Sequence, residues 1–371
     1  MKLTIGKYAS VGLAALLVAC SGGEDTAAMS EDNSAANQES ATETNDAAAE
    51  PGSNGTLRIY SARHYDSDKF MYEAFEEKTG IRVLYREAGA NQLLETMKAE
   101  GENSPADLII ASDAGALWRF EDAGLTQTLP DGEFEGVLQE RLIEPAGQWV
   151  GLARRIRGVA YDPERINPDQ VDQWQDLADP SLEGEICVRS STNIYNLSLM
   201  AEMVETWGPE KAQEWADGVV ANMARSPQGG DTNQIEGVAA GLCSVAITNH
   251  YYWVRMLESS ASSDREAAEA TEIIFPTFGE GEGIHVNITG VALAKNAKNR
   301  DAAIEFIEFL LTPQGQRLLV DETKEIPVIE GVSWPDGLDA IPDFEDSETP
   351  LDTFGERQAE AQRIYDEAGW N

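Results

Sequence analysis

Three short apolar runs decide the fold of this chain: Leu57-Arg58-Ile59-Tyr60, Ile81-Arg82-Val83-Leu84-Tyr85 and Ala106-Asp107-Leu108-Ile109-Ile110-Ala111. Helical patterns separate them, one from about Asp68 to Lys78 and one that starts at Asn91. Strands that alternate with helices in this way pair in parallel, and the helices cover both faces of the sheet. The sequence therefore predicts an α/β fold with three layers.

Strand and helix patterns of the same kind continue along the chain. Extended stretches are expected at Gln148 to Tyr161, Gly184 to Val188, Ser244 to Thr248, Ile273 to Pro276 and Gly290 to Leu293. Helices are expected at about Tyr195 to Thr206, Pro209 to Val220 and Arg300 to Leu311. With 371 residues, 42% of them hydrophobic, the chain is long enough for two lobes.

The N-terminal segment has the features of an export signal. Lys2 and Lys7 precede an apolar run from Val11 to Ala19 that is too short to span a bilayer. The run ends in Leu17-Val18-Ala19-Cys20-Ser21, which resembles a bacterial lipobox. This resemblance implies that residues 1–20 are a lipoprotein signal peptide and that Cys20 carries the lipid; the alternative is an ordinary cleaved signal peptide. Several acyl chains on one cysteine would anchor the protein stably.

Neither residues 21–55 nor the net charge of the chain identifies a ligand. The segment has no Lys or Arg and one long apolar side chain, Met29, so we expect a disordered acidic tether. The whole chain has 66 acidic and 27 basic residues, a formal net charge of -39. Such a surface repels nucleic acid and anionic lipid, so neither is an expected partner. Strong acidity suits a cation ligand, but it also accompanies adaptation to salt.

Several segments resemble the solute-binding proteins of bacterial ABC importers: Leu57–Ser61, Thr79–Val83, Pro105–Ile109, Gly290–Ala297 and Thr312–Gln316. The resemblance extends from Thr56 to about Val332. It implies a type II-like periplasmic binding fold, in which crossing hinge strands join two α/β lobes and the ligand lies in the cleft between them. Residues 56–151 and 276–331 would form the N-terminal lobe, and residues 152–275 and 332–371 the C-terminal lobe. The fold alone does not give the ligand.

Four tyrosines occupy settings that look like loops just past strand ends, where open α/β sheets present ligands. Tyr65 follows the first strand in Arg63-His64-Tyr65. Tyr195 follows Ser190-Ser191-Thr192-Asn193-Ile194, and the pair Tyr251-Tyr252 follows Asn249-His250. A lone tyrosine is usually a surface or core-edge residue. Any one of these tyrosines alone is therefore weak evidence for a ligand site.

This set resembles the site of the ferric-binding proteins of iron ABC importers. The family uses a tandem Tyr-Tyr, here Tyr251 and Tyr252, with a further tyrosine in the same lobe, here Tyr195. Tyr65 matches the tyrosine of the subgroup with a His-Tyr first loop, and its separation from Tyr195, 130 residues, fits that subgroup. The resemblance implies that these four are metal ligands. His64 is a less certain candidate: it is either a direct metal ligand or a residue behind the ligands.

Two arginines and a few other polar residues complete the expected surroundings. Arg155 and Arg255 lie where the family places cleft arginines, which implies that they balance phenolate charge or hold a synergistic anion. The sequence leaves open whether carbonate, citrate or water completes the site. His250 and His285 are expected to be structural, and Asp113 is a weak candidate for a carboxylate ligand.

The chemistry of an all-tyrosine site favours Fe(III) as the cargo. Hard cations prefer oxygen ligands. A free phenol has a pKa near 10, so it is neutral in the periplasm, and a trivalent ion within bonding distance strongly favours the phenolate. Binding should therefore release protons. Divalent ions gain less Coulomb energy for the same deprotonation, which makes the site selective for the ferric ion.

The two remaining cysteines, Cys187 and Cys243, are expected to form a disulfide, because an exported chain meets an oxidising compartment. A soft-metal pair is the alternative, but no CxxC spacing supports it. A disulfide here would contribute about 4 kcal/mol in the chain-entropy model.

The sequence thus predicts a monomeric periplasmic protein, anchored to the cell envelope only by lipid, that captures Fe(III) and delivers it to an ABC transporter permease. One alternative is a binding protein for another small solute, such as a polyamine, thiamine, a phosphonate or an iron chelate. A hydrolytic or redox enzyme on the same fold is the other. We expect no enzymatic activity, because the sequence has no HExxH, no GxSxG and no phosphate-cradling Gly-rich loop.

Overall fold

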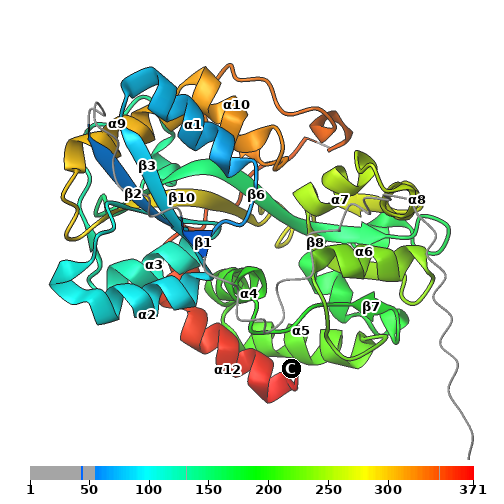
Figure 1. The fold of residues 1–371 in the computed structure, drawn as a ribbon. Coiled ribbons are helices and arrows are strands. Elements are labelled where there is room, and N and C mark those ends of the chain that lie inside the picture. Colours follow the sequence, from blue (N-terminus) through cyan, green and yellow to red (C-terminus); the bar gives the residue numbers. More distant parts are fainter. Residues whose placement is uncertain (1–42, 45–54, 131, 342) are drawn as a thin grey trace, which may run out of the picture. The chain divides into compact units, whose positions relative to one another are not determined.

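The computed structural model describes residues 43–44, 55–130, 132–341 and 343–371, and it confirms the α/β fold. The three predicted apolar runs form β2 (Thr56–Ser61), β3 (Arg82–Glu87) and β4 (Leu108–Ala111). β2 lies between the other two and pairs with both in parallel, as the crossover helices α1 (Asp68–Thr79) and α2 (Ala90–Glu100) require. We call the part of the molecule around these strands the first lobe (Figure 1).

One long strand, β6 (Trp149–Tyr161), joins the first lobe to the rest of the fold. Its first half pairs antiparallel with β10 (Val286–Ala294) and β11 (Ile326–Pro327). Its second half pairs with β8 (Val245–Asn249) and β9 (Glu272–Ile274), and β7 (Ile186–Cys187) extends the sheet beside β8. The part around β7 and β8 is the second lobe. The strand order is β1-β3-β2-β4-β10-β6-β8-β7, and β5 (Thr126–Gln127) pairs with β10.

Each lobe has its own apolar core. In the first lobe, buried Leu57, Ile59 and Leu108 pack with Phe75 of α1 and Phe306 of α9 (Arg300–Leu310). The second lobe is centred on Trp174, Trp215 and Met200, from segments that follow β6 in the chain. A smaller cluster packs beneath the helix that carries Tyr251. Burial of apolar area at about 25 cal/mol per Å² makes these separate clusters the main source of stability in each lobe.

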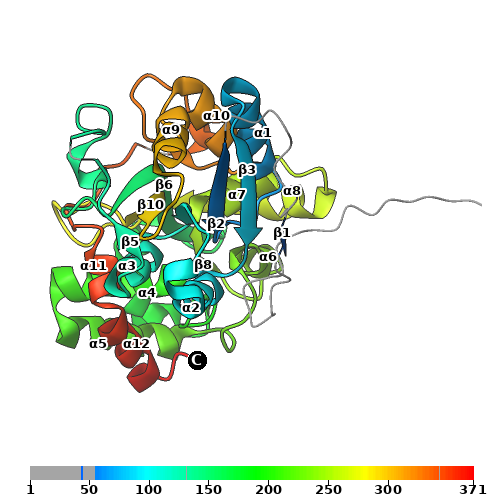
Figure 2. The same cartoon turned by 60° about the vertical axis from the view of Figure 1, so that its left-hand side comes forward.

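The remaining helices surround these cores. They are α3 (Ala114–Asp122), α4 (Ile194–Trp207), α5 (Pro209–Asn222), α6 (Asp231–Ala239), α7 (His250–Leu257), α8 (Ser262–Glu269), α10 (Pro313–Val320), α11 (Thr353–Glu356) and α12 (Gln358–Ala368). α12 lies against α4 and α5 (Figure 2). Tyr365 Oη donates to the carbonyl of Asn196 at 3.0 Å, and Trp370 Nε1 donates to that of Arg189 at 2.9 Å. The chain end is therefore packed onto the second lobe.

The segment expected to be a disordered tether contains a short strand. Glu43 and Thr44 form β1, which pairs antiparallel with β3 opposite Glu87 and Arg86. The expectation of disorder was wrong for these two residues. β3 is otherwise at the edge of the sheet, and the unpaired backbone groups of an edge strand accept any extended segment. The signal segment with Cys20 and most of the tether lie outside the described residues. Within the described residues, no helix is long and apolar enough to cross a membrane.

Candidate metal centre

Two helix starts in the second lobe carry three of the four tyrosines. Tyr195 lies in the first turn of α4, where the N-cap Asn193 accepts a hydrogen bond from its backbone N–H at 3.0 Å. Tyr251 and Tyr252 lie in the first turn of α7, so the expectation of a loop was wrong for this pair. The four aromatic residues from His250 to Trp253 have no helical periodicity that would reveal α7. The positive end of a helix dipole favours an anionic phenolate.

Arg155 lies at the centre of this arrangement. Its Nη2 donates to Tyr195 Oη at 3.4 Å and also to Tyr251 Oη, and its guanidinium lies over both rings, 5.0 Å and 4.5 Å from their centroids. Asn249 Nδ2 donates to Tyr251 Oη at 3.0 Å. The rings of Tyr251 and Tyr252 are 4.5 Å apart. The structure thus brings Tyr195 and Tyr251 together around one guanidinium, with the Tyr252 ring beside that of Tyr251.

Tyr65 reaches the same place from the first lobe. It lies half-buried in the loop after β2, with the guanidinium groups of Arg63 and Arg255 at 4.9 Å and 5.5 Å from its ring centroid. Its phenol is close enough to Arg155 and Tyr195 for each to shift its pKa. We call Tyr65, Tyr195, Tyr251 and Tyr252 the tyrosine cluster. The neighbouring His64 is exposed, and its charge interaction is with Asp68.

The phenols of Tyr65 and Tyr251 are protonated at neutral pH in the metal-free protein. Burial raises the pKa of Tyr65 to about 12, although Arg155 and Arg255 lower it. Burial also raises the pKa of Tyr251 well above its ordinary value, again opposed by Arg155. Burial penalises a phenolate that lacks a partner, so the anionic form needs a bound cation.

A buried ion network holds Arg155 and the first-lobe loop. Arg155 Nε is 3.0 Å from Glu325, whose other oxygen accepts from Arg63 Nη1 at 2.8 Å. Arg63 also pairs with Asp68 at 2.9 Å. Burial opposes ionisation of Glu325, but Arg63 and Arg155 outweigh it and hold its pKa below the ordinary value. Sequence reasoning missed Glu325, because an isolated charged residue distant in sequence from Arg63 carries no local signal.

Three other polar residues considered from the sequence have structural partners. His250 is buried: its Nδ1 accepts from Ile156 N at 3.1 Å, and its Nε2 donates to the carbonyl of Lys324 at 2.9 Å. His285 Nδ1 pairs with buried Glu202. Asp113 is the N-cap of α3 and accepts from Gly115 N and Ser198 Oγ, both at 2.8 Å. In the described part of the chain, no group of three or more His, Cys, Asp or Glu could hold a metal.

A small polar cavity lies behind Tyr195, with walls from both lobes. Ser112 and Asp113 line it from the first lobe, and Arg157, Tyr195 and Asn249 line it from the second. Its volume is about 10 Å³, enough for roughly one water molecule.

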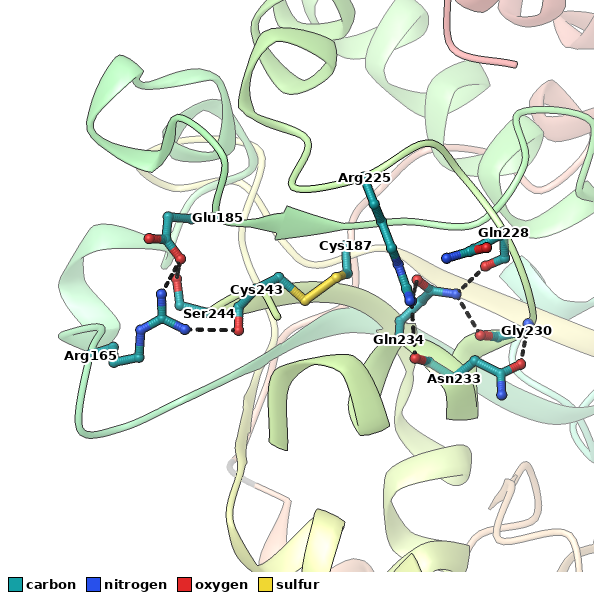
Figure 3. Close-up of a disulfide and its surroundings, with 10 residues drawn as sticks. All are labelled: Arg165, Glu185, Cys187, Arg225, Gln228, Gly230, Asn233, Gln234, Cys243 and Ser244. Atoms are coloured by element: carbon teal, nitrogen blue, oxygen red, sulfur yellow. Dashed lines mark hydrogen bonds and ion pairs between the residues drawn. A yellow bond between two sulfur atoms is a disulfide. The ribbon is translucent and has the colours of Figure 1, made fainter. Parts of the chain in front are cut away.

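The two cysteines form the expected disulfide. Cys187 of β7 and Cys243, just before β8, are buried, with Cα atoms 5.9 Å apart (Figure 3). The bond connects the segment that leads to Tyr195 with the segment that leads to Tyr251. It excludes a soft-metal site at this pair.

The chain is similar to several known proteins. Residues 103–350 match a family model described as "Bacterial extracellular solute-binding protein". The chain is 40% identical to Iron uptake protein A1 of Synechocystis, over 86% of this chain and 89% of that protein. It is 25% identical to the Major ferric iron-binding protein of Neisseria meningitidis serogroup B, over 84% of this chain and 92% of that protein.

Two solved structures are also similar to this chain over most of its length. A Trichodesmium protein in complex with iron and citrate ligands superposes with a TM-score of 0.82 at 38% identity, covering 85% of this chain and all of that one. A ferric binding protein from Campylobacter jejuni gives 0.81 at 35% identity, with the same coverage.

Proposed function

Because this chain belongs to the bacterial extracellular solute-binding protein family, we propose that it captures ferric iron with its tyrosine cluster and delivers the ion to an ABC importer. The observation that carries the proposal is the convergence of four phenols from two lobes. Tyr195 and Tyr251 share one guanidinium, and Tyr65 approaches from the opposite lobe. Oxygen ligands of this kind suit a hard trivalent cation.

The charges around the cluster support a ferric rather than a divalent cargo. Four phenolates would carry a charge of about minus four against plus three for the ion. Arg155, whose own countercharge is the buried Glu325, donates to two of the phenols and offsets part of that excess. A divalent ion would leave more uncompensated negative charge in a buried site, which is costly. The site therefore discriminates by charge as well as by ligand type.

Closure of the lobes would complete the site. In this proposal, residues 152–275 and 332–371 form the lobe that presents Tyr195, Tyr251 and Tyr252. Residues 56–151 and 276–331 form the lobe that brings Tyr65. Iron bonds formed only in the closed state would shift the equilibrium toward that state, and the permease would recognise it. The relatives that the chain matches are transport proteins, which supports a binding role rather than a catalytic one.

We also propose that the protein is exported and attached to the envelope through Cys20, on the basis of the lipobox-like sequence before it. Mass spectrometry of the protein from its native membrane should find the acyl groups on Cys20. A mature chain that starts elsewhere without lipid would contradict this part.

The test of iron capture is visible absorbance. Phenolate bound to Fe(III) gives a visible charge-transfer band, so adding ferric citrate to the metal-free protein should colour it. The double variant Tyr251→Phe plus Tyr252→Phe should lose the band and bind iron at least 100-fold more weakly, on the order of 2.7 kcal/mol. Tyr161→Phe is the matched control, because Tyr161 is a buried tyrosine whose phenol donates to Glu272 instead. An intact band in the double variant would exclude the tyrosine cluster as the site.

A further inference from the structure

Asp231 is a fully buried carboxylate at the start of α6 that contacts three segments leading to the tyrosine cluster. Its Oδ2 accepts from Arg157 Nη1 at 2.9 Å and from the backbone N–H of Asn249 at 2.8 Å. Its Oδ1 accepts from Arg189 Nη1 at 2.9 Å. Arg157 lies on β6, Arg189 follows β7, and Asn249 ends β8. One side chain therefore connects β6 with the residues that follow or end β7 and β8, just before Tyr195 and Tyr251.

The residues that Asp231 contacts are themselves linked to Tyr251 or to the residue next to Tyr195. Asn249 receives a hydrogen bond from Arg157 Nη1 at 2.9 Å, and its own Nδ2 donates to Tyr251 Oη at 3.0 Å. Arg157 Nη2 donates to the side chain of Asn196 at 2.6 Å, next to Tyr195. Asp231 is thus two contacts away from the Tyr251 phenol, and two contacts away from Asn196, the residue after Tyr195.

Arg157 and Arg189 also lie against the tyrosine of α4. Their guanidinium groups are 5.9 Å and 5.6 Å from the ring centroid of Tyr195. Both arginines are buried, and two buried like charges repel strongly unless a carboxylate lies between them. Burial opposes ionisation of Asp231, but the two arginines outweigh it and hold its pKa below the ordinary value. The group as a whole carries one positive charge behind Tyr195.

The far part of α6 is fixed independently by the disulfide. Gly237 packs directly on the two sulfur atoms: a Cβ at this position would be 3.3 Å from Cys187 Sγ and 3.5 Å from Cys243 Sγ. α6 is therefore held at its first residue by the arginines and at its seventh by the disulfide that Figure 3 shows. A helix anchored in this way is a rigid support for Asp231.

We propose that Asp231 is a positioning residue for iron binding, which holds the Tyr195 and Tyr251 segments in place through Arg157, Arg189 and Asn249 before the metal arrives. The inference rests on the proposed function. Residues behind metal ligands orient them, and their loss lowers metal affinity about 10- to 100-fold. Asp231→Asn keeps the shape of the side chain but removes the charge between the arginines.

The experiment compares Asp231→Asn with Asp107→Asn. Asp107 is equally buried and also connects segments, accepting from the backbone N–H of Arg58, Lys298 and Asn299, each at 2.9 Å, but it lies in the first lobe away from the tyrosines. Both variants should lose stability. Competition with citrate should show that Asp231→Asn binds ferric iron about 10- to 100-fold more weakly, with a visible band altered at saturating iron. Asp107→Asn should match the wild type in both iron readouts.

Other outcomes separate this inference from the proposed function. Should Asp231→Asn not fold, Asn249→Ala serves in its place, because it breaks the link to Tyr251 without unpairing a charge; it should weaken binding about tenfold. Wild-type affinity and band in the variant tested would overturn the positioning role alone. An equal loss in Asp107→Asn would do the same, since it would attribute the effect to stability. A wild-type protein with no visible iron band would overturn the proposed function and this inference together.

Discussion

The two lobes hold their shares of the tyrosine cluster in different ways. In the second lobe, Tyr195 and Tyr251 lie in the first turns of helices, and the buried Arg155 donates to both phenols. In the first lobe, Tyr65 lies on a loop, and the guanidinium groups of Arg63 and Arg255 are 4.9 Å and 5.5 Å from its ring centroid. Stacking on a guanidinium constrains a ring less than a hydrogen bond constrains a phenol oxygen.

This difference suggests a division of labour in iron capture. A rigid half-site loses little conformational entropy when the metal arrives, because its side chains were ordered during folding. A loop that contributes one ligand can approach last without disturbing the other three. The second lobe would then set the initial affinity, and Tyr65 would set how slowly the iron leaves.

The largest expected effect is the dependence of iron affinity on pH. Burial raises the pKa of Tyr65 to about 12 and that of Tyr251 well above its ordinary value, so each phenolate that forms on iron binding releases one proton. Affinity must therefore fall as pH falls, by about tenfold per pH unit for each phenolate. Four ligands would release about four protons per iron at pH 7, measured with a pH indicator in weak buffer.

The same measurement separates the lobes. Tyr65→Phe should release one proton fewer than the wild type when iron comes from the same ferric citrate stock, because the release from citrate cancels in the difference. Equal proton release by the two proteins would show that Tyr65 does not bind as a phenolate.

The second effect concerns the rigidity of the second lobe. Replacing both Cys187 and Cys243 by alanine opens a loop with a sequence separation of 56 residues, and should lower the free energy of unfolding by about 4 kcal/mol. Urea denaturation measures this loss. Cys20→Ala removes a cysteine outside the bond and should have no effect. A double variant as stable as the wild type would mean that α6 and the two strands are held by packing alone.

The third effect compares single ligands from each lobe. Tyr195→Phe should weaken iron binding at least 100-fold, on the order of 2.7 kcal/mol, because it removes an oxygen from the fixed half-site. Tyr65→Phe should cost about tenfold, and mainly through faster release to a chelator. Stopped-flow absorbance measures both rates. The reverse order, with Tyr65→Phe costing more, would contradict the division of labour between the lobes.

Much of the fold could be predicted from local patterns. The apolar runs of β2, β3 and β4 and the amphipathic helices between them are periodic over their own length, so neighbouring residues suffice to identify them. α6 and α7 were missed. α6 follows Gly229-Gly230 and has few large apolar residues, and α7 is only eight residues long. Burial against other segments, rather than propensity, stabilises such short helices.

The four tyrosines could be identified from the sequence, but the buried carboxylates behind them, Asp231 and Glu325, could not. The resemblance of the four tyrosines to the ligands of the ferric-binding family indicated a shared site. Nothing local distinguishes Asp231 from the exposed acidic residues that begin many helices, because its partner Arg157 lies 74 residues away. Glu325 is harder still, with Arg63 at a separation of 262 residues. Local sequence gives only the residue type. The roles of Asp231 and Glu325 depend on segments that are distant in the chain and that the fold places beside them.

The smallest expected effect lies at the contact between the lobes near Lys324. Its ammonium is 2.5 Å from Glu258 Oε2 at the end of α7, and the glutamate is 38% exposed. Solvent screening limits such a pair to roughly 1 kcal/mol or less. Lys324→Met should therefore lower iron affinity less than about fivefold, by making the closed state slightly less favourable. Lys98→Met is the control, because Lys98 pairs with Glu95 within one helix of the first lobe, and affinity should stay unchanged. A larger loss in Lys324→Met, measured by citrate competition, would mean that the second lobe takes part in closure through α7 and is not the passive half of the site.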